Sequence, residues 1–433
     1  DPVISFQDSI NQVFNYSLAG FPQYISTYNG MFGFLTSSNR GIIVGESTNV
    51  PNSLRSSLAS NANLSINLLS NFEISSNIEV YEIIGWGENT IKGVEYRSKK
   101  ENICSTQNSI YSCQNQSVWD RKLSMTRDGD GTVVIPSAVN QANASEYYLN
   151  LFNQNAGFGT NFKHHNILES SFALDIISSI FTENLSTTSL PEYVSTQKPI
   201  VASKSLQLSV HSPVSIEAFD TQGRFTGINT ALSADGFTFV KEEIPNSYYL
   251  EIADDKYIGL EENGDYSIIL QGNGVGTFTF DQEIIQEGSV IESKSFINIP
   301  TTPLTEASLS INGGILSDNM NMDVDGNGTT DLQIQSSNEF NPIDYLNVMK
   351  FIIKSFGLER SQETDLITKI DNLIKYIQNG DIQKAASKAE IFVKKLNLKL
   401  AKIDGGENTS RKLTEEEMLI VIQNLEEFIL NLK

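Results

Sequence analysis

Between residues 206 and 280, apolar residues occupy every second position of several short runs. This period of two is typical of β-strands that bury one face and expose the other. Turn sequences rich in Gly, Asn and Asp, such as those at 220–223 and 272–274, separate the runs. The pattern predicts an antiparallel β-sandwich over residues 196–297. The runs with this period are 206–210, 214–216, 266–270 and 278–280.

From residue 343 onwards, the spacing of apolar residues changes to that of helices. One helical stripe includes Leu366 and Ile370, and the sequence Thr414-x-x-Glu417 is a capping-box pattern before another stripe. We therefore expect a small α-helical bundle over residues 341–433. The segment 298–340, which begins with a stretch rich in Pro and Thr, is predicted to be a linker.

The first part of the chain contains one nearly continuous apolar run at residues 78–85. Such a run favours a strand of a parallel sheet that is covered on both faces. Residues 93–97 and 121–126 are predicted to be the arms of a long hairpin, with Cys104 and Cys113 in its polar tip. The two cysteines either close a small loop disulfide in an oxidising compartment or are free thiols.

Length and charge restrict the class of protein. A chain of 433 residues exceeds the usual size of a single domain, so we expect three modules. A formal net charge of −22 argues against nucleic acid as a partner, because binding to phosphates depends on Lys and Arg. No apolar stretch reaches the roughly 18 to 20 residues of a membrane span, so we expect no transmembrane segment.

Two short segments carry residues capable of acid–base chemistry. Residues 128–137 read Asp-Gly-Asp-Gly-Thr-Val-Val-Ile-Pro-Ser, and residues 164–170 read His-His-Asn-Ile-Leu-Glu-Ser. An Asp in a Gly-rich turn can orient an imidazole, which can take a proton from a serine hydroxyl and return it to the leaving group. The chain has no Gly-x-Ser-x-Gly elbow. The segments therefore predict the acid and the base of a serine hydrolase whose nucleophile is not visible.

Residues 78–87, the Gly-Asp-Gly-Thr-Val sequence at 129–133, and residues 165–168 resemble the closing stretch of lipases and acyltransferases related to lecithin:cholesterol acyltransferase. The resemblance covers about the first 190 residues. It implies a multidomain fold in which residues 1–190 form the C-terminal part of an α/β-hydrolase domain with its cap. The order of acid before base agrees with that fold.

The same resemblance assigns roles to single residues. It makes Asp130 the acid and His165 the base, with Asp128 and His164 as adjacent alternatives. It also implies a lid that lines an acyl pocket, although ordinary core packing is the alternative for these apolar residues. The residues of that lid would be Phe14, Leu18, Phe21, Tyr24, Tyr28, Met31, Phe32, Phe34 and Leu35.

From these features we expect the C-terminal part of a secreted serine hydrolase of the lipase, esterase or acyltransferase kind. Its nucleophile would lie upstream of Asp1, so the chain alone would be inactive. The partner would be a lipid or another acyl ester, and the location extracellular or at the cell surface. The alternative is an extracellular adhesion or binding protein with a cell-surface partner and a non-catalytic hydrolase-like segment.

A second polar segment predicts a metal site in the linker. Oxygen-bearing residues alternate along it around Gly326, as in short calcium loops of extracellular bacterial modules. Ile334 stands where an EF-hand has its bidentate Glu, so an ordinary EF-hand is excluded. We expect a structural calcium ion, with Glu339 as a further candidate ligand. The alternative is a polar turn of Asp, Asn and Gly that binds no ion. The expected ligands are Asp323, Asp325, Asn327, Thr329 and Asp331.

Overall fold

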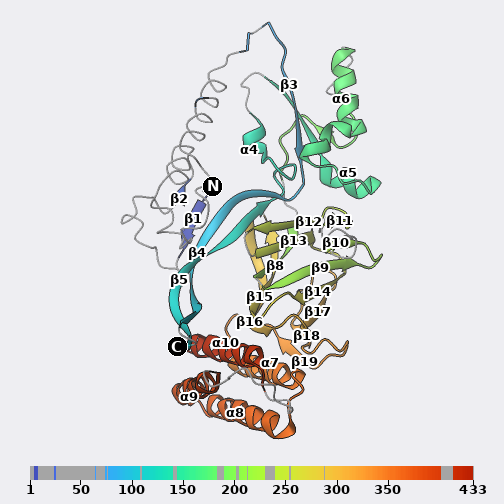
Figure 1. Ribbon diagram of the computed structural model, residues 1–433. Coiled ribbons are helices and arrows are strands. Elements are labelled where there is room, and N and C mark those ends of the chain that lie inside the picture. Colours follow the sequence, from blue (N-terminus) through green and yellow to red (C-terminus); the bar gives the residue numbers. More distant parts are fainter. Residues whose placement is uncertain are drawn as a thin grey trace. The chain divides into compact units, whose positions relative to one another are not determined.

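In the computed structural model, the chain divides into two compact units, and Figure 1 labels their helices and strands. The first comprises Asp1–Glu101, Gln116–Ser203 and Gln286–Ser289, and the second comprises Asn102–Asn115, Lys204–Ile285 and Val290–Lys433. Within them, the structure describes residues 4–7, 24–25, 64, 74–75, 77–107, 110–139, 144–182, 190–200, 204–211, 213–229, 239–252, 255–286, 288–400 and 413–432. The lid predicted from the resemblance lies outside the residues whose side chains are described.

The first unit contains a short mixed sheet with helices around it. Its elements are β3 (Tyr81–Trp86), α4 (Ile135–Ala138), β6 (Ser145–Asn150), α5 (Leu151–Phe158), the 3₁₀ helix η2 (His164–Glu169), α6 (Ser171–Phe181) and β7 (Val194–Ser195). β3 and β6 pair in parallel, with Ile84 opposite Tyr148, and β7 pairs antiparallel with β6. Tyr148 and Leu149 follow one another in β6 yet belong to different apolar clusters. Both faces of the sheet are therefore covered, as the apolar run at 78–85 predicts.

A second sheet has the strand order β2-β1-β4-β5. Its strands are β1 (Ile4–Gln7), β2 (Tyr24–Ile25), β4 (Thr90–Gln107) and β5 (Ile110–Thr126). β4 and β5 are adjacent, which confirms the predicted hairpin, but both strands extend much further than the sequence pattern indicates. Cys104 and Cys113 lie within the strands rather than in a tip loop. Their side chains are outside those described, so the disulfide and the two free thiols both stay predictions.

The second unit contains two sheets of mainly antiparallel strands. The seven-stranded sheet has the order β11-β10-β9-β14-β17-β18-β19, and the five-stranded sheet the order β12-β13-β8-β15-β16. The strands are β8 (Lys204–His211), β9 (Val214–Asp220), β10 (Phe225–Asn229), β11 (Phe239–Glu242), β12 (Tyr248–Ile252), β13 (Asp255–Glu261), β14 (Tyr266–Gly272), β15 (Gly276–Gln286), β16 (Ser289–Thr301), β17 (Glu306–Ile311), β18 (Asn319–Asp323) and β19 (Leu332–Gln335). Alternate residues of β9 and β14 are buried, as the period of two predicts. Both sheets contribute to one hydrophobic cluster.

The segment 298–340, for which the sequence predicts a linker, contains strands of both sheets. It holds the end of β16 and all of β17, β18 and β19, and the last three extend the seven-stranded sheet beyond β14. Met320 and Met322 alternate with exposed or half-exposed polar residues in β18 and are fully buried. Strands of four to six residues give a weak periodic signal, and their place at one edge of a larger sheet depends on pairing with β14.

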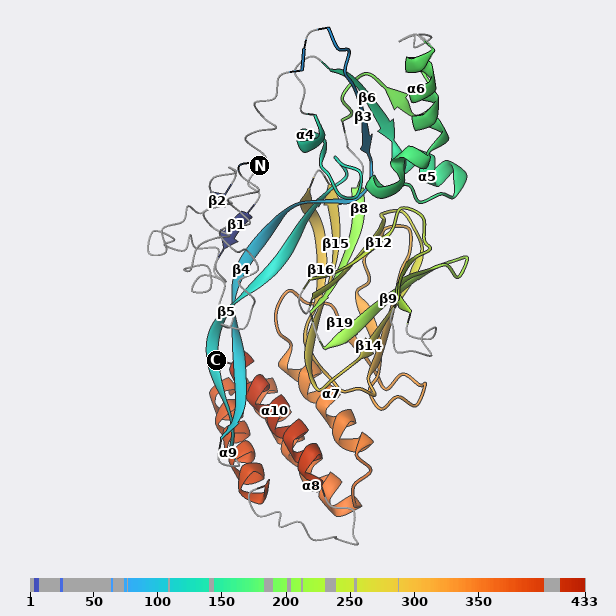
Figure 2. The same cartoon turned by 45° about the horizontal axis from the view of Figure 1, so that its top comes forward.

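Four helices follow the sheets, as the sequence predicts. They are α7 (Pro342–Ser355), α8 (Arg360–Gln378), α9 (Ile382–Leu400) and α10 (Glu415–Asn431). The stripe containing Leu366 and Ile370 is buried, and Thr414 and Glu417 form the expected capping box at the start of α10. Figures 1 and 2 show the four helices grouped together, and their buried residues join the same hydrophobic cluster as the two sheets. None of the helices that the structure describes combines the length and the apolar character needed to cross a membrane.

Candidate active site around Asp130 and His164

The Gly-Asp-Gly turn lies against the end of β3. The backbone N–H of Glu88 donates to the carbonyl of Gly129 at 3.0 Å, and Glu88 and Asp130 form an isolated parallel bridge. A Cβ at Gly129 would lie 2.6 Å from both Thr90 Oγ1 and the Val133 carbonyl oxygen. Gly131 has a φ of +94°, a left-handed conformation that side chains disfavour. The two glycines therefore allow the turn to approach Thr90 closely and to reverse direction after Asp130.

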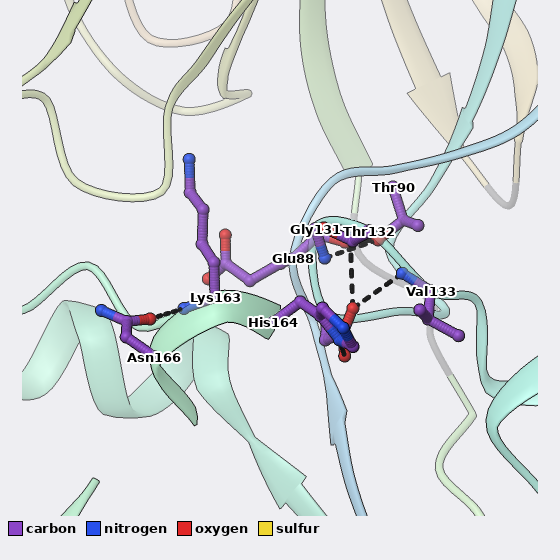
Figure 3. Close-up of polar contacts among 9 residues, drawn as sticks. Glu88, Thr90, Gly131, Thr132, Val133, Lys163, His164 and Asn166 are labelled. Atoms are coloured by element: carbon purple, nitrogen blue, oxygen red, sulfur yellow. Dashed lines mark hydrogen bonds and ion pairs between the residues drawn. The ribbon is translucent and has the colours of Figure 1, made fainter. Parts of the chain in front are cut away.

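The carboxylate of Asp130 is held on both of its oxygens. Oδ1 accepts hydrogen bonds from the backbone N–H groups of Thr132 at 3.1 Å and Val133 at 2.8 Å. Oδ2 lies 2.8 Å from Nδ1 of His164. Figure 3 labels Thr132 and Val133 of this turn and the His164 side chain beside it. The side chain of Asp130 is only 9% exposed, so a buried carboxylate with a fixed orientation faces the imidazole.

His164 is also hydrogen-bonded to Asp130 through its backbone. Its N–H donates to the carbonyl of Asp130 at 2.8 Å. The preceding Lys163 has an extended conformation, and its N–H donates to Oδ1 of Asn166 at 2.7 Å (Figure 3). The His164 side chain is 50% exposed. A neutral ring whose Nδ1–H donates to a carboxylate has Nε2 as its acceptor, which is the form that a general base needs.

The base predicted from the sequence differs from the observed partner of Asp130 by one residue. The sequence places the base at His165, whereas the contact is made by the adjacent alternative, His164. His165 is exposed and is the next residue of η2. The hydrogen bond from the His164 N–H to the Asp130 carbonyl holds the first residue of η2 beside Asp130. It therefore favours His164 over His165 as the imidazole that faces the carboxylate.

Asp128, the alternative acid, has a different environment from Asp130. Its carbonyl accepts from the N–H of Ile135 at 2.8 Å, and its own N–H donates to Thr126 Oγ1 at 3.1 Å. Burial raises the pKa of the Asp128 carboxyl, and the nearby charge of Lys198 partly opposes this. Desolvation thus disfavours the charged form of Asp128, and the His164 ring is paired with Asp130 instead.

Two buried polar residues near this pair are not evident from the sequence. Glu88 is 3% exposed and Asn155 is fully buried, and Asn155 Nδ2 donates to Glu88 Oε1 at 2.8 Å. The residues are 67 positions apart and belong to no motif. In a chain rich in polar residues, sequence alone does not distinguish a buried amide from an exposed one. The only signal is the position of Glu88 directly after the Gly-Trp-Gly that ends β3.

The acidic loop between β18 and β19 brings part of the predicted metal site together. One carboxylate oxygen from each of Asp323, Asp325 and Asp331 lies within 4.8 Å of the other two. Asn327 differs, because its Oδ1 accepts from both the N–H and the hydroxyl of Thr329. Glu339 does not belong to this group. The three carboxylates among the five predicted ligands therefore converge in the part of the chain that the structure describes.

The chemistry available at the first site is proton transfer at His164 Nε2. Within the described residues, no serine hydroxyl is hydrogen-bonded to this ring, whose partner is Asp130. An acid–imidazole pair of this kind occurs on unrelated folds and is recognised by its geometry. Comparisons of the chain with family models, with curated proteins and with solved structures found no match.

Proposed function

We propose that Asp130 and His164 are the acid and the base of a serine-hydrolase site that acts on acyl esters. The observation that carries the proposal is the buried Asp130 carboxylate, bound by two backbone N–H groups on one oxygen and by His164 Nδ1 on the other. The parallel pair β3 and β6, with the acid beside the end of β3 and the base after β6, also supports an α/β-hydrolase-like arrangement. The extracellular location and the lipid nature of the ester rest on the resemblance alone.

In the proposed mechanism, His164 Nε2 takes the proton from a serine hydroxyl as the serine oxygen attacks the ester carbonyl. Asp130 stabilises the resulting imidazolium through Nδ1. The imidazolium then gives its proton to the departing alcohol, which leaves a serine ester. Water, activated by the same nitrogen, hydrolyses that ester and restores the serine. The serine and the oxyanion-hole donors would come from residues that the structure does not describe at this site.

Substitution of the two adjacent histidines tests the proposal in the natural protein that contains this chain. We expect His164→Gln to lower kcat for hydrolysis of p-nitrophenyl esters by about 1,000-fold, because it removes the general base. His165→Gln is the matched control and should change kcat by no more than about threefold, since its exposed ring does not bind Asp130. The chain alone has no Gly-x-Ser-x-Gly sequence and should show no serine-dependent turnover.

The reverse ranking of the two histidine variants would overturn the assignment of the base. Absence of ester turnover in the unsubstituted natural protein would overturn the enzymatic proposal as a whole. That second outcome would favour the alternative from the sequence, a binding protein that contains a non-catalytic pair.

We also propose that the loop between β18 and β19 binds calcium in a structural role. The supporting observation is the convergence of the Asp323, Asp325 and Asp331 carboxylates, because Ca²⁺ prefers clustered oxygen ligands. The carboxylates lie between two paired strands, so a bound ion would crosslink the ends of β18 and β19. This proposal does not depend on the proposed catalytic role of Asp130 and His164.

Calcium is expected to raise the melting temperature of the chain. The measurement compares thermal unfolding in the presence of a chelator with thermal unfolding in millimolar Ca²⁺. An ion present at about 100 times its Kd stabilises the folded state by roughly 2.7 kcal/mol. Asp325→Asn should abolish most of this increase, whereas Asp365→Asn, on an exposed part of α8, should preserve it. An equal calcium response in the two variants, or none in the original chain, would contradict the proposal.

A further inference from the structure

We propose that Asn155 is a positioning residue that holds His164 in line with Asp130. Its catalytic consequence rests on the function proposed above, whereas its effect on the geometry of His164 does not. Asn155 lies in the last turns of α5 and is fully buried. It makes no direct contact with the catalytic pair in the structure, so it would act through the segment that leads to His164.

The side-chain amide of Asn155 uses its full hydrogen-bonding capacity. Oδ1 accepts from the N–H of Phe162 at 2.7 Å and from Thr160 Oγ1 at 3.0 Å. Nδ2 donates to the Phe162 carbonyl at 3.0 Å and to Glu88 Oε1 at 2.8 Å. A primary amide has two N–H donors and two acceptor lone pairs. All four are satisfied here, so few other side chains could replace this one.

The segment that the amide binds is irregular and leads directly to His164. α5 ends at Phe158 with Gly159 as its C-cap, and no regular element begins before η2 starts at His164. The Asn155 side chain hydrogen-bonds both the N–H and the carbonyl of Phe162. A neighbouring β-strand would satisfy these two backbone groups in a similar way. Phe162 is two residues before His164, so this clamp limits where the imidazole can lie.

Glu88 connects the same amide to the turn that carries the acid. Its side chain accepts from Asn155, and its backbone N–H donates to the Gly129 carbonyl, one residue before Asp130. Glu88 is drawn with the residues of the site in Figure 3. The contacts therefore form a closed circuit from Asp130 through Glu88, Asn155 and Phe162 to His164, which returns to Asp130. This closed circuit restrains both Asp130 and His164 through the residues that precede them in the chain.

Gln154 provides a matched control from the neighbouring position of α5. It is also a buried amide, at 2% exposed. Its Nε2 donates to Ser170 Oγ at 2.9 Å, and its Oε1 lies 3.1 Å from the same hydroxyl oxygen. These hydrogen bonds do not involve the segment before His164. Gln154→Ala therefore removes a comparable buried amide from the same helix, but it leaves the circuit around Asp130 intact.

The test is ¹⁵N NMR of the chain labelled at histidine. There are three histidines, and His211, whose Nδ1 lies 2.6 Å from Asp255 Oδ1, is an internal reference for a carboxylate-bound ring. We expect His164 to show the Nδ1–H tautomer with a protected proton. Asn155→Ala should increase exchange of that proton by about tenfold or more and mix the tautomers, because the ring loses its restraint.

Gln154→Ala should leave the His164 signals unchanged, even where its melting temperature falls as much as that of Asn155→Ala. Thr160→Val removes one hydrogen bond to Asn155 and should give a smaller change of the same kind. This variant keeps the test possible if Asn155→Ala does not fold. An unchanged His164 tautomer and exchange rate in both Asn155→Ala and Thr160→Val would overturn the proposal.

In the natural protein, Asn155→Ala should lower kcat for ester hydrolysis by about 10- to 100-fold, with KM changed by less than about threefold. Failure of the unsubstituted protein to hydrolyse esters would contradict the proposed function. The NMR result would still decide whether Asn155 positions His164, so the two failures are distinguishable.

Discussion

Asp130→Asn is expected to lower kcat for ester hydrolysis in the natural protein by about 10,000-fold, the loss typical of a triad acid replaced by its amide. The reason lies in how the carboxylate is held. Oδ1 is fixed by the N–H groups of Thr132 and Val133, so the oxygen of an Asn amide would take that position. Its NH₂ group would then face His164 Nδ1, which would have to accept a hydrogen bond. The ring proton would move to Nε2, and the base would be blocked.

The control for this substitution is Asp128→Asn, which changes a neighbouring acid that does not contact the ring. We expect its kcat to remain within about tenfold of the original. The tautomer of His164, followed by ¹⁵N NMR, should change to Nε2–H in Asp130→Asn and stay as Nδ1–H in Asp128→Asn. Full activity of Asp130→Asn, or a larger loss in Asp128→Asn, would show that Asp130 is not the acid.

Leu425→Ala is expected to destabilise the second unit by about 2 to 5 kcal/mol, because it leaves a cavity in a closely packed core. Leu425 lies in α10, is 0% exposed, and belongs to the hydrophobic cluster shared by the helices and the two sheets. The midpoint of urea unfolding, followed by circular dichroism of the helices, measures the effect. The loss is large because a buried side chain surrounded on all sides allows little relaxation.

Leu398→Ala is the matched control, since the same residue type in α9 is 60% exposed. Its effect should stay within about 0.5 kcal/mol. If the two substitutions shifted the urea midpoint equally, α10 would not be packed against the rest of the unit as the structure describes.

Local patterns in the sequence predict much of this architecture. The period of two in β9 and β14 reflects one buried face of each strand, and the stripe on α8 reflects the helical repeat. The capping box at Thr414 is likewise local, because its two hydrogen bonds join residues three positions apart. Features of this kind depend on side-chain direction along one element, which the residue order encodes directly.

The limits of sequence reasoning are clearest where distant segments meet. β17, β18 and β19 are short, and only their pairing beside β14 makes them part of the larger sheet. The predicted metal loop differs, because its candidate ligands are close to one another in the sequence. Its residue spacing identifies five oxygen-bearing candidates, and the turn brings together the three carboxylates among them, those of Asp323, Asp325 and Asp331.

For the candidate active site, the sequence by itself indicated Asp130 as the proposed acid and the short segment that contains the proposed base. The glycines around Asp130 are required locally, since one avoids a clash beside Thr90 and the other adopts a positive φ. The choice of His164 over His165 was decided only by tertiary structure. Adjacent side chains point in different directions, and the orientation of this segment depends on a backbone bond to Asp130 and on the clamp from Asn155. Those partners come from other elements, so the residue order near His164 does not contain them.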